Sequence, residues 1–147
     1  MSRTALDTNV LASGFVGVRI STSTAGEVLR RWRAGEFTLI SSEPILRELD
    51  RVFGTSYFAR RLSAGERQAD INLLRREAFV TELTVQVRGI ATHPEDDLVL
   101  STALSGRAEY LVTGDGALRR LGAYDGVTIL SPREFLERLG GTGNTEG

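Results

Sequence analysis

Residues 4–11, Thr-Ala-Leu-Asp-Thr-Asn-Val-Leu, place an acidic residue directly behind a short apolar run. The run predicts a buried strand, which puts Asp7 at the carboxyl end of that strand. Residues 111–115, Leu-Val-Thr-Gly-Asp, repeat the pattern and place Asp115 in a tight turn behind a second strand. The carboxyl ends of parallel strands line the ligand crevice of an open α/β sheet, so we expect the two carboxylates to meet there.

Short apolar or β-branched segments alternate with helical patterns along the chain. Strands are expected at residues 3–7, 37–41, 82–87, 109–113 and 127–130. Helices are expected at residues 23–35, 43–54, 64–78, 97–106, 116–121 and 132–139. This alternation predicts an α/β fold built from parallel βαβ units.

Three segments have weaker patterns. Residues 54–63 suit either a short helix or a loop. Residues 12–24, which include Gly14 and Gly17, are predicted to be a mobile connection beside the site. The tail from residue 140 to 147 is rich in glycine and lacks apolar residues, so it is predicted to be disordered. Residues 1–139 then form a single domain.

Composition excludes several kinds of chemistry. The chain of 147 residues has no cysteine, which rules out disulfides, thiolate zinc sites and a cysteine nucleophile. All 18 basic residues are arginine, so no lysine is present to act in a P-loop or a Schiff base. A net charge of −1 differs from the basic surface of an avid nucleic-acid binder, although charge can be segregated for transient binding. The lack of signal-peptide or membrane-length apolar runs predicts a cytoplasmic protein without membrane contact.

Two further acidic residues, Glu48 and Asp97, lie near the starts of helical patterns, and each has a competing interpretation. Asp97 begins a helical pattern, where it would suit a helix N-cap, and the adjacent Glu95 and Asp96 compete with it for any metal role. Glu48 and Asp50 lie at opposite edges of one apolar helix face, since successive residues turn by ~100°. Periodicity does not choose between these two.

Neutral oxygen-bearing side chains accompany the acids at the strand ends. Thr8 and Asn9 follow Asp7, and Thr113 precedes Asp115 by two residues. Such side chains can orient carboxylates that bind a metal. Aspartate is also common in turns, so Asp7 and Asp115 each have a structural interpretation as well.

Several acids at one edge of a sheet would repel one another and raise some of their pKa values. A hard cation such as Mg²⁺ or Mn²⁺ prefers carboxylate oxygens and would relieve this repulsion. The joint pattern therefore predicts a metal site.

Five segments in order resemble the PIN-domain family, specifically members regarded as toxin components of type II toxin–antitoxin pairs. They are residues 6–11, 42–49, 94–103, 110–115 and 129–136. The resemblance extends over almost the whole chain, to about residue 139.

The resemblance implies a three-layer α/β/α sandwich around a central parallel sheet. It also implies an Mg²⁺- or Mn²⁺-dependent endoribonuclease that leaves 5′-phosphate and 3′-hydroxyl ends. By position, it selects Glu48 over Asp50 and Asp97 over Asp96. The implied catalytic residues and metal ligands are Asp7, Glu48, Asp97 and Asp115, supported by Thr8, Asn9, Asp96 and Thr113.

The expected partners are a single-stranded or structured RNA substrate, a cognate antitoxin protein and further copies of the chain in a homodimer or higher homo-oligomer. The alternative is a catalytically weak or inactive PIN-fold module that acts by binding RNA or protein. One position departs from the family pattern, because His93 stands where an acid is usual before the proline. This change could alter metal preference or the approach of substrate.

Overall fold

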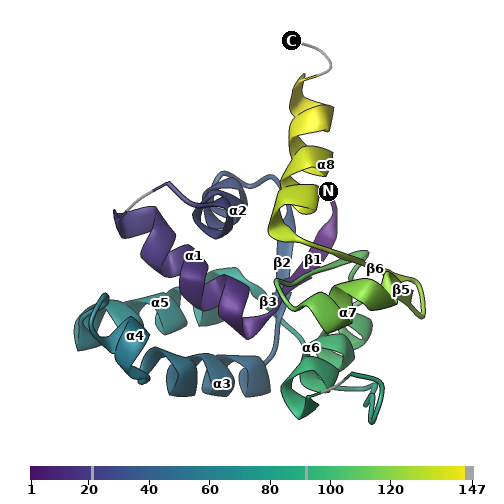
Figure 1. Ribbon diagram of the computed structural model, residues 1–147, viewed down its shortest axis with the longest axis horizontal. Helices are drawn as coiled ribbons and strands as arrows, with labels where there is room; N and C mark the ends of the chain where they lie inside the picture. The colour runs from purple at the N-terminus through teal and green to yellow at the C-terminus, as the bar shows by residue number, and fades with distance from the viewer. Residues whose placement is uncertain (21, 92, 145–147) are drawn as a thin grey trace.

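The computed structural model describes residues 1–20, 22–91 and 93–144, and its strands form one sheet (Figure 1). The strands are β1 (Arg3–Leu6), β2 (Thr38–Ser41), β3 (Phe79–Val80), β4 (Tyr110–Val112), β5 (Ala123–Tyr124) and β6 (Val127–Leu130). The helices are α1 (Thr8–Ile20), α2 (Thr24–Arg33), α3 (Glu43–Phe53), α4 (Ser56–Ala59), α5 (Ala64–Glu77), α6 (Pro94–Ser105), α7 (Gly116–Leu121) and α8 (Pro132–Asn144).

The six-stranded sheet has the order β3-β2-β1-β4-β6-β5, and its strand pairs are parallel except for β5 with β6. Helices cover both faces. Figure 1 shows α1 and α2 on the left of the sheet and α6 on the right, where α6 packs against β1, β2 and β4. The predicted α/β fold with a central, mostly parallel sheet is confirmed.

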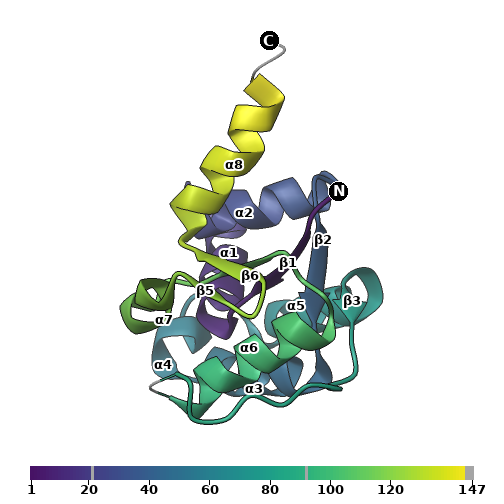
Figure 2. The same ribbon diagram turned by 90° about the vertical axis from the view of Figure 1, so that its right-hand side faces the viewer.

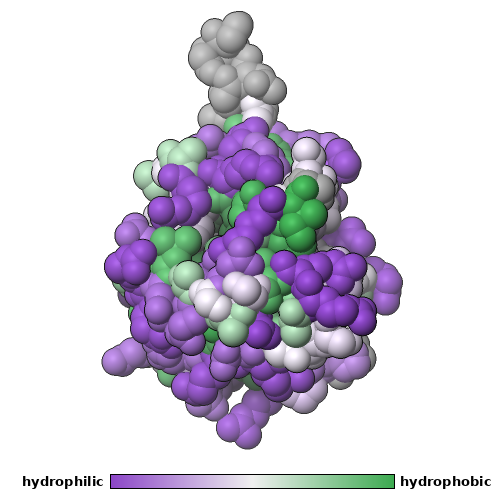
Figure 3. Space-filling view, turned by 90° about the vertical axis from the view of Figure 1, so that its left-hand side faces the viewer, coloured by the Kyte–Doolittle hydropathy of each residue, from purple (hydrophilic) through white to green (hydrophobic). Residues whose placement is uncertain are grey.

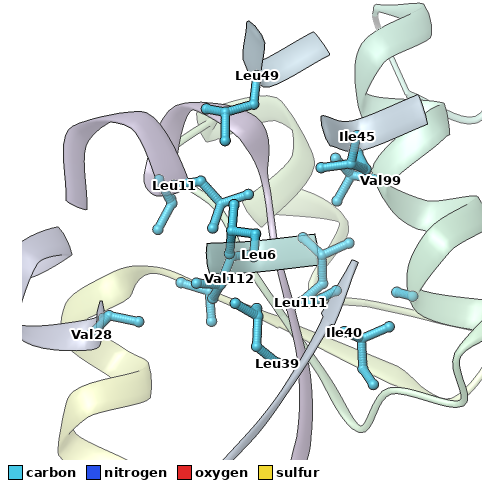
Figure 4. Packing of buried hydrophobic residues seen from close by; sticks show 14 of the residues in the cluster. Leu6, Leu11, Val28, Leu39, Ile40, Ile45, Leu49, Val99, Leu111 and Val112 are labelled. Atoms are coloured by element: carbon cyan, nitrogen blue, oxygen red, sulfur yellow. The ribbon is translucent and has the colours of Figure 1, made fainter. Parts of the chain in front are cut away.

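The two central strands are buried on both faces, which is why their sequences are continuously apolar. Leu6 of β1 and Leu111 and Val112 of β4 are almost completely inaccessible to solvent. Figure 4 shows these side chains packed with Leu11 from α1 and Ile45 from α3. The core therefore anchors the strand ends from which the acidic residues emerge.

The predicted mobile connection was wrong, because residues 8–20 form helix α1 and only Ser21 in this region lies outside the described residues. Its glycines serve close packing. A Cβ on Gly26 of α2 would lie 2.9 Å from the backbone carbonyl carbon of Gly17 in α1. A Cβ on Gly14 would lie 2.8 Å from the side chain of Leu29 in α2. Glycine here lets two helices touch.

The predicted strand at residues 82–87 was also wrong. This segment belongs to an irregular strap, residues 81–91, that runs alongside α6 from its C-terminal end towards its N-terminal end (Figure 2). Its backbone N–H groups donate to α6 side chains: those of Thr84 and Val85 to Ser105 Oγ, both at 3.0 Å, and that of Val87 to Ser101 Oγ at 2.8 Å. Side chains of a helix thus accept the backbone N–H groups that a neighbouring strand was expected to accept. The actual third strand, β3, is short and immediately precedes the strap.

Several element boundaries differ from expectation. Helix α6 begins at Pro94 instead of residue 97, and α4 forms within the ambiguous residues 54–63. The antiparallel strand β5 was not predicted.

Helix α8 runs to Asn144 and projects from the body in Figures 1 and 2, so the predicted disordered tail overlaps its end. Residues 145–147 of that predicted tail lie outside the described residues. None of the helices in residues 1–20, 22–91 and 93–144 is long and apolar enough to cross a bilayer.

Gly26→Ala is expected to lower the free energy of unfolding by about 1–3 kcal/mol, because the added methyl group meets backbone that has no room to retreat. Gly65→Ala is the matched control. Gly65 also lies in a helix, α5, but the nearest atom to its Cβ position is 3.9 Å away. That change should stabilise the protein by up to about 1 kcal/mol. Urea denaturation measures both, and equal effects would refute the close-packing explanation.

Candidate functional site

The candidate site lies at the topological switch point of the sheet, where later strands are added on the opposite side of β1. From β1 the chain proceeds to β2 and β3 on one side, and later to β4, β5 and β6 on the other. Leu6 and Val112 are register partners, and the backbone N–H of Asp7 donates to the carbonyl oxygen of Val112 at 3.0 Å. The residues that follow β1 and β4 therefore begin side by side, at the usual ligand position of such sheets.

Asp7 is held by both of its carboxylate oxygens and is only 6% exposed. Oδ1 accepts a hydrogen bond from the Val10 N–H at 2.8 Å, at the beginning of α1, and Oδ2 accepts one from the Thr113 hydroxyl. Burial raises the pKa of Asp7 above its ordinary value, and the charge of Asp115 adds to the increase. The hydrogen bonds from Thr113 and Val10 oppose it. The result is a fixed, partly desolvated carboxylate.

Thr113 links this carboxylate to the next one. It is completely buried, and its hydroxyl oxygen accepts the backbone N–H of Asp115 at 3.0 Å while its hydrogen goes to Asp7. Asp115 caps α7, where its Oδ2 accepts from the Leu118 N–H at 2.7 Å. The structure thus brings Asp7, Thr113 and Asp115 together, as the sequence predicts.

Asp96, in the first turn of α6, faces the same place. The pKa of Asp96 is raised to about 6, chiefly by burial and further by the negative charges of Asp115, Asp7 and Glu95, with His93 acting in the opposite direction. These electrostatic effects show that Asp96 is close enough to Asp7 and Asp115 to sense their charges.

Asp97, which the family resemblance selects, lies away from this pocket in the structure. Its carboxylate accepts the backbone N–H groups of Gly89, Ile90 and Ala91 at 2.9, 3.2 and 2.8 Å, which anchors the strap. Because α6 begins at Pro94, both aspartates lie inside the helix, where successive side chains diverge by ~100°. Only Asp96 borders the site, and Asp97 borders a separate cleft under the strap.

Glu48 reaches the site from α3. Ser42 caps this helix, accepting the Ile45 N–H at 3.4 Å, and its hydroxyl lies 2.9 Å from the Thr102 hydroxyl of α6. Glu48 is 18% exposed and lines the pocket, whereas Asp50 is exposed and does not. Both Glu48 oxygens accept hydrogen bonds from Arg51, from Nε at 3.1 Å and from Nη2 at 2.5 Å.

A single pocket of about 430 Å³ joins these side chains. Its lining is mostly acidic or polar and consists of Asp7, Thr8, Asn9, Glu48, Arg51, Val52, His93, Glu95, Asp96, Val99, Gly114 and Asp115. Glu95 was weighed in the sequence as a competitor of Asp97, whereas Arg51 was not singled out as a site residue. Its position one helical turn after Glu48 is a signal that hydrophobic periodicity alone does not reveal.

The donor set suits a hard divalent cation. Carboxylate oxygens are the ligands that Mg²⁺ and Mn²⁺ prefer, and the mutual effect on pKa values shows uncompensated negative charge. Within residues 1–20, 22–91 and 93–144, no three acidic or histidine side chains are arranged as a ready coordination shell. The acids border one pocket without converging on a single point.

Comparison with known proteins identifies one family. A family model described as the PIN domain matches residues 3–117, from β1 to the beginning of α7. The matched region contains every acidic residue that lines the pocket. No curated protein matches the chain.

Mn²⁺ is expected to stabilise the protein more above about pH 6 than at about pH 5. The pKa of Asp96 is raised on folding, so its contribution to stability in metal-free protein is present below its ordinary pKa of 3.8. That contribution is lost as the pH rises through about 6. Metal requires the charged carboxylate, which prevails above that range. Thermal denaturation with and without Mn²⁺ across this range measures the difference, and Asp96→Asn is the control that should flatten it. A stabilisation by Mn²⁺ that does not change with pH would contradict this expectation.

Proposed function

Because the chain belongs to the PIN domain family, we propose that it is an Mg²⁺- or Mn²⁺-dependent endoribonuclease. The observation that supports this most is that Asp7, Asp96 and Asp115 line one pocket, at the point of the sheet where the strand order reverses. These three residues are the proposed metal ligands. Glu48 completes the acidic wall, and Thr8, Asn9 and Thr113 support the ligands.

The chain's own residues prepare this pocket for a cation. Thr113 and the N-terminus of α1 hold Asp7, and the N-terminus of α7 holds Asp115, so neither carboxylate has to be ordered when a ligand arrives. Carboxylate oxygens have further lone pairs beyond those used in these hydrogen bonds. A divalent cation bound there would activate a water molecule and stabilise the charge that develops on a phosphodiester.

The proposed ligand set uses Asp96 where the family resemblance selected Asp97. Asp97 has three backbone hydrogen bonds to the strap, and moving its carboxylate into the pocket would leave those N–H groups without their partner. Three hydrogen bonds from backbone N–H groups to one charged carboxylate favour its present position over one in the pocket. We therefore assign Asp97 the role of holding the strap next to the site.

The proposed biological role is that of a toxin with a cognate antitoxin. The toxin is proposed to act in the cytoplasm as a homo-oligomer of this chain. Support for a protein partner comes from Val18 and Ile20 at the end of α1, which are 37% and 59% exposed. Figure 3 shows apolar surface among hydrophilic groups on the side of the molecule that carries α1 and α2. Exposed apolar patches commonly mark association surfaces.

Asp96→Asn is expected to reduce Mn²⁺-dependent cleavage of labelled single-stranded RNA by about 100-fold or more, because a metal ligand contributes several kcal/mol to transition-state stabilisation. Asp97→Asn is the matched control, one residue away with the same loss of charge. It should lower the free energy of unfolding by about 1–3 kcal/mol through the strap while cleavage by folded protein is retained. If Asp97→Asn abolished cleavage and Asp96→Asn did not, the proposed ligand set would be refuted.

A binding module without catalysis is the second candidate, and the pairing of both Glu48 oxygens with Arg51 favours it. Calorimetric titration with Mn²⁺ separates the two. Metal binding that is lost in Asp7→Asn supports the nuclease, and no binding at millimolar metal supports the module.

Expression of the wild-type chain in bacteria is expected to arrest growth, and Asp96→Asn is expected to relieve the arrest at equal protein abundance. The reason is that toxicity, if it comes from RNA cleavage, requires the metal ligands. Growth curves with immunoblots measure both quantities. Arrest that persists in Asp96→Asn would mean that toxicity does not arise from cleavage at this pocket.

A further inference from the structure

We propose that Arg51 is a phosphate-binding residue of the pocket, held in position by Glu48, and that it contacts a backbone phosphate of the nucleic acid. This inference rests on the proposed function for its class of substrate. It assigns Glu48 the role of a positioning residue for Arg51.

The geometry of the pair supports this role. Nε and Nη2 of Arg51 donate to the two oxygens of Glu48 in a fork, one helical turn along α3. Among the described residues, Nη1 of Arg51 makes no hydrogen bond. Arg51 lines the pocket and its side chain is 63% exposed, whereas Glu48 is 18% exposed. The acid thus anchors the guanidinium, and the remaining N–H groups stay accessible to a ligand.

The negative charge of the pocket explains why a cationic residue is needed to bind a phosphate there. Five lining residues are acidic, and a nucleic-acid phosphate is itself an anion. Among the lining residues that the structure describes, two side chains can carry positive charge, those of Arg51 and His93. A guanidinium presents a planar fork that matches phosphate oxygens and stays charged at all relevant pH values.

An ordinary surface ion pair is the competing explanation. Exposed pairs spaced three residues apart on a helix contribute little to stability, so stability measurements alone do not separate the two explanations. The chain offers a matched control in Arg47, which lies one turn earlier on α3, is exposed and does not line the pocket. Arg47→Gln and Arg51→Gln remove the same charge from the same helix.

The experiment measures binding of a fluorescent single-stranded RNA by anisotropy in Mn²⁺, with Asp115→Asn in every protein to prevent cleavage. Arg51→Gln is expected to weaken binding about tenfold or more, the usual effect of losing a charged hydrogen bond. It should also reduce the slope of log Kd against log salt by about 0.7, the value of one phosphate contact on a single strand. Arg47→Gln should change the affinity by less than about twofold and leave that slope unchanged.

Two further variants test the anchoring by Glu48. Glu48→Gln keeps the charge of Arg51 but weakens the fork, so binding should weaken while the salt slope stays that of the parent protein. Arg51→Lys should recover the slope and only part of the affinity, since ammonium lacks the planar fork. Thermal denaturation of each variant confirms that it is folded.

Equal affinities and salt slopes for Arg51→Gln and Arg47→Gln would overturn the proposal. Cleavage by the protein with native Asp115 is a separate readout. If that protein cleaves RNA but Arg51 and Arg47 variants bind alike, the nuclease stands and the role of Arg51 fails. If it does not cleave but binding depends on Arg51, the phosphate contact stands and the nuclease fails. Absence of any RNA binding overturns the Arg51 proposal.

Discussion

The hydrogen bond from Thr113 to Asp7 joins the carboxyl ends of the two central strands, and the arrangement of the pocket depends on it. It crosses from β4 to β1 where the chain reverses direction across the sheet. The same hydroxyl oxygen accepts the backbone N–H of Asp115, so one side chain sets the positions of two carboxylates. Burial makes this bond valuable, because the buried Asp7 carboxylate would otherwise lack a partner for one oxygen.

The other three acids of the pocket come from two helices that are tied to each other. The hydroxyls of Ser42, at the beginning of α3, and Thr102, within α6, lie 2.9 Å apart. This contact fixes the helix that carries Glu48 relative to the helix that carries Asp96. The strap adds a second restraint on α6 through Ser101, Ser105 and Asp97, whose oxygens accept its backbone N–H groups. The pocket is therefore bordered by elements with little freedom to separate.

Local sequence patterns predicted the parts of this arrangement that depend on neighbouring residues. The apolar runs behind Asp7 and Asp115 are strands because both faces are buried, and that requirement is visible in the sequence. The packing role of Gly17 was missed because the contact that requires a glycine there is made with the backbone of a distant segment, α2. The strap was mistaken for a strand because a short run of apolar and β-branched residues does not reveal whether a strand or the side chains of a helix will accept its N–H groups.

Family position selects Asp97, whereas Asp96 is the neighbour that lines the pocket, and helix geometry separates the two side chains. A helix expected from residue 97 makes Asp97 its first residue, whereas a helix from Pro94 turns Asp96 and Asp97 in different directions. In a strand end such as Asp7, the acid follows the last paired residue and its direction is set by the sheet. In a run of acids within a helix, the direction of each depends on packing. For Glu48, the α3 helix also places Arg51 within reach of the carboxylate, so the charge of this acid is already paired within its own helix. The chemistry available to an acidic pocket thus depends as much on the cations that share its walls as on the number of carboxylates.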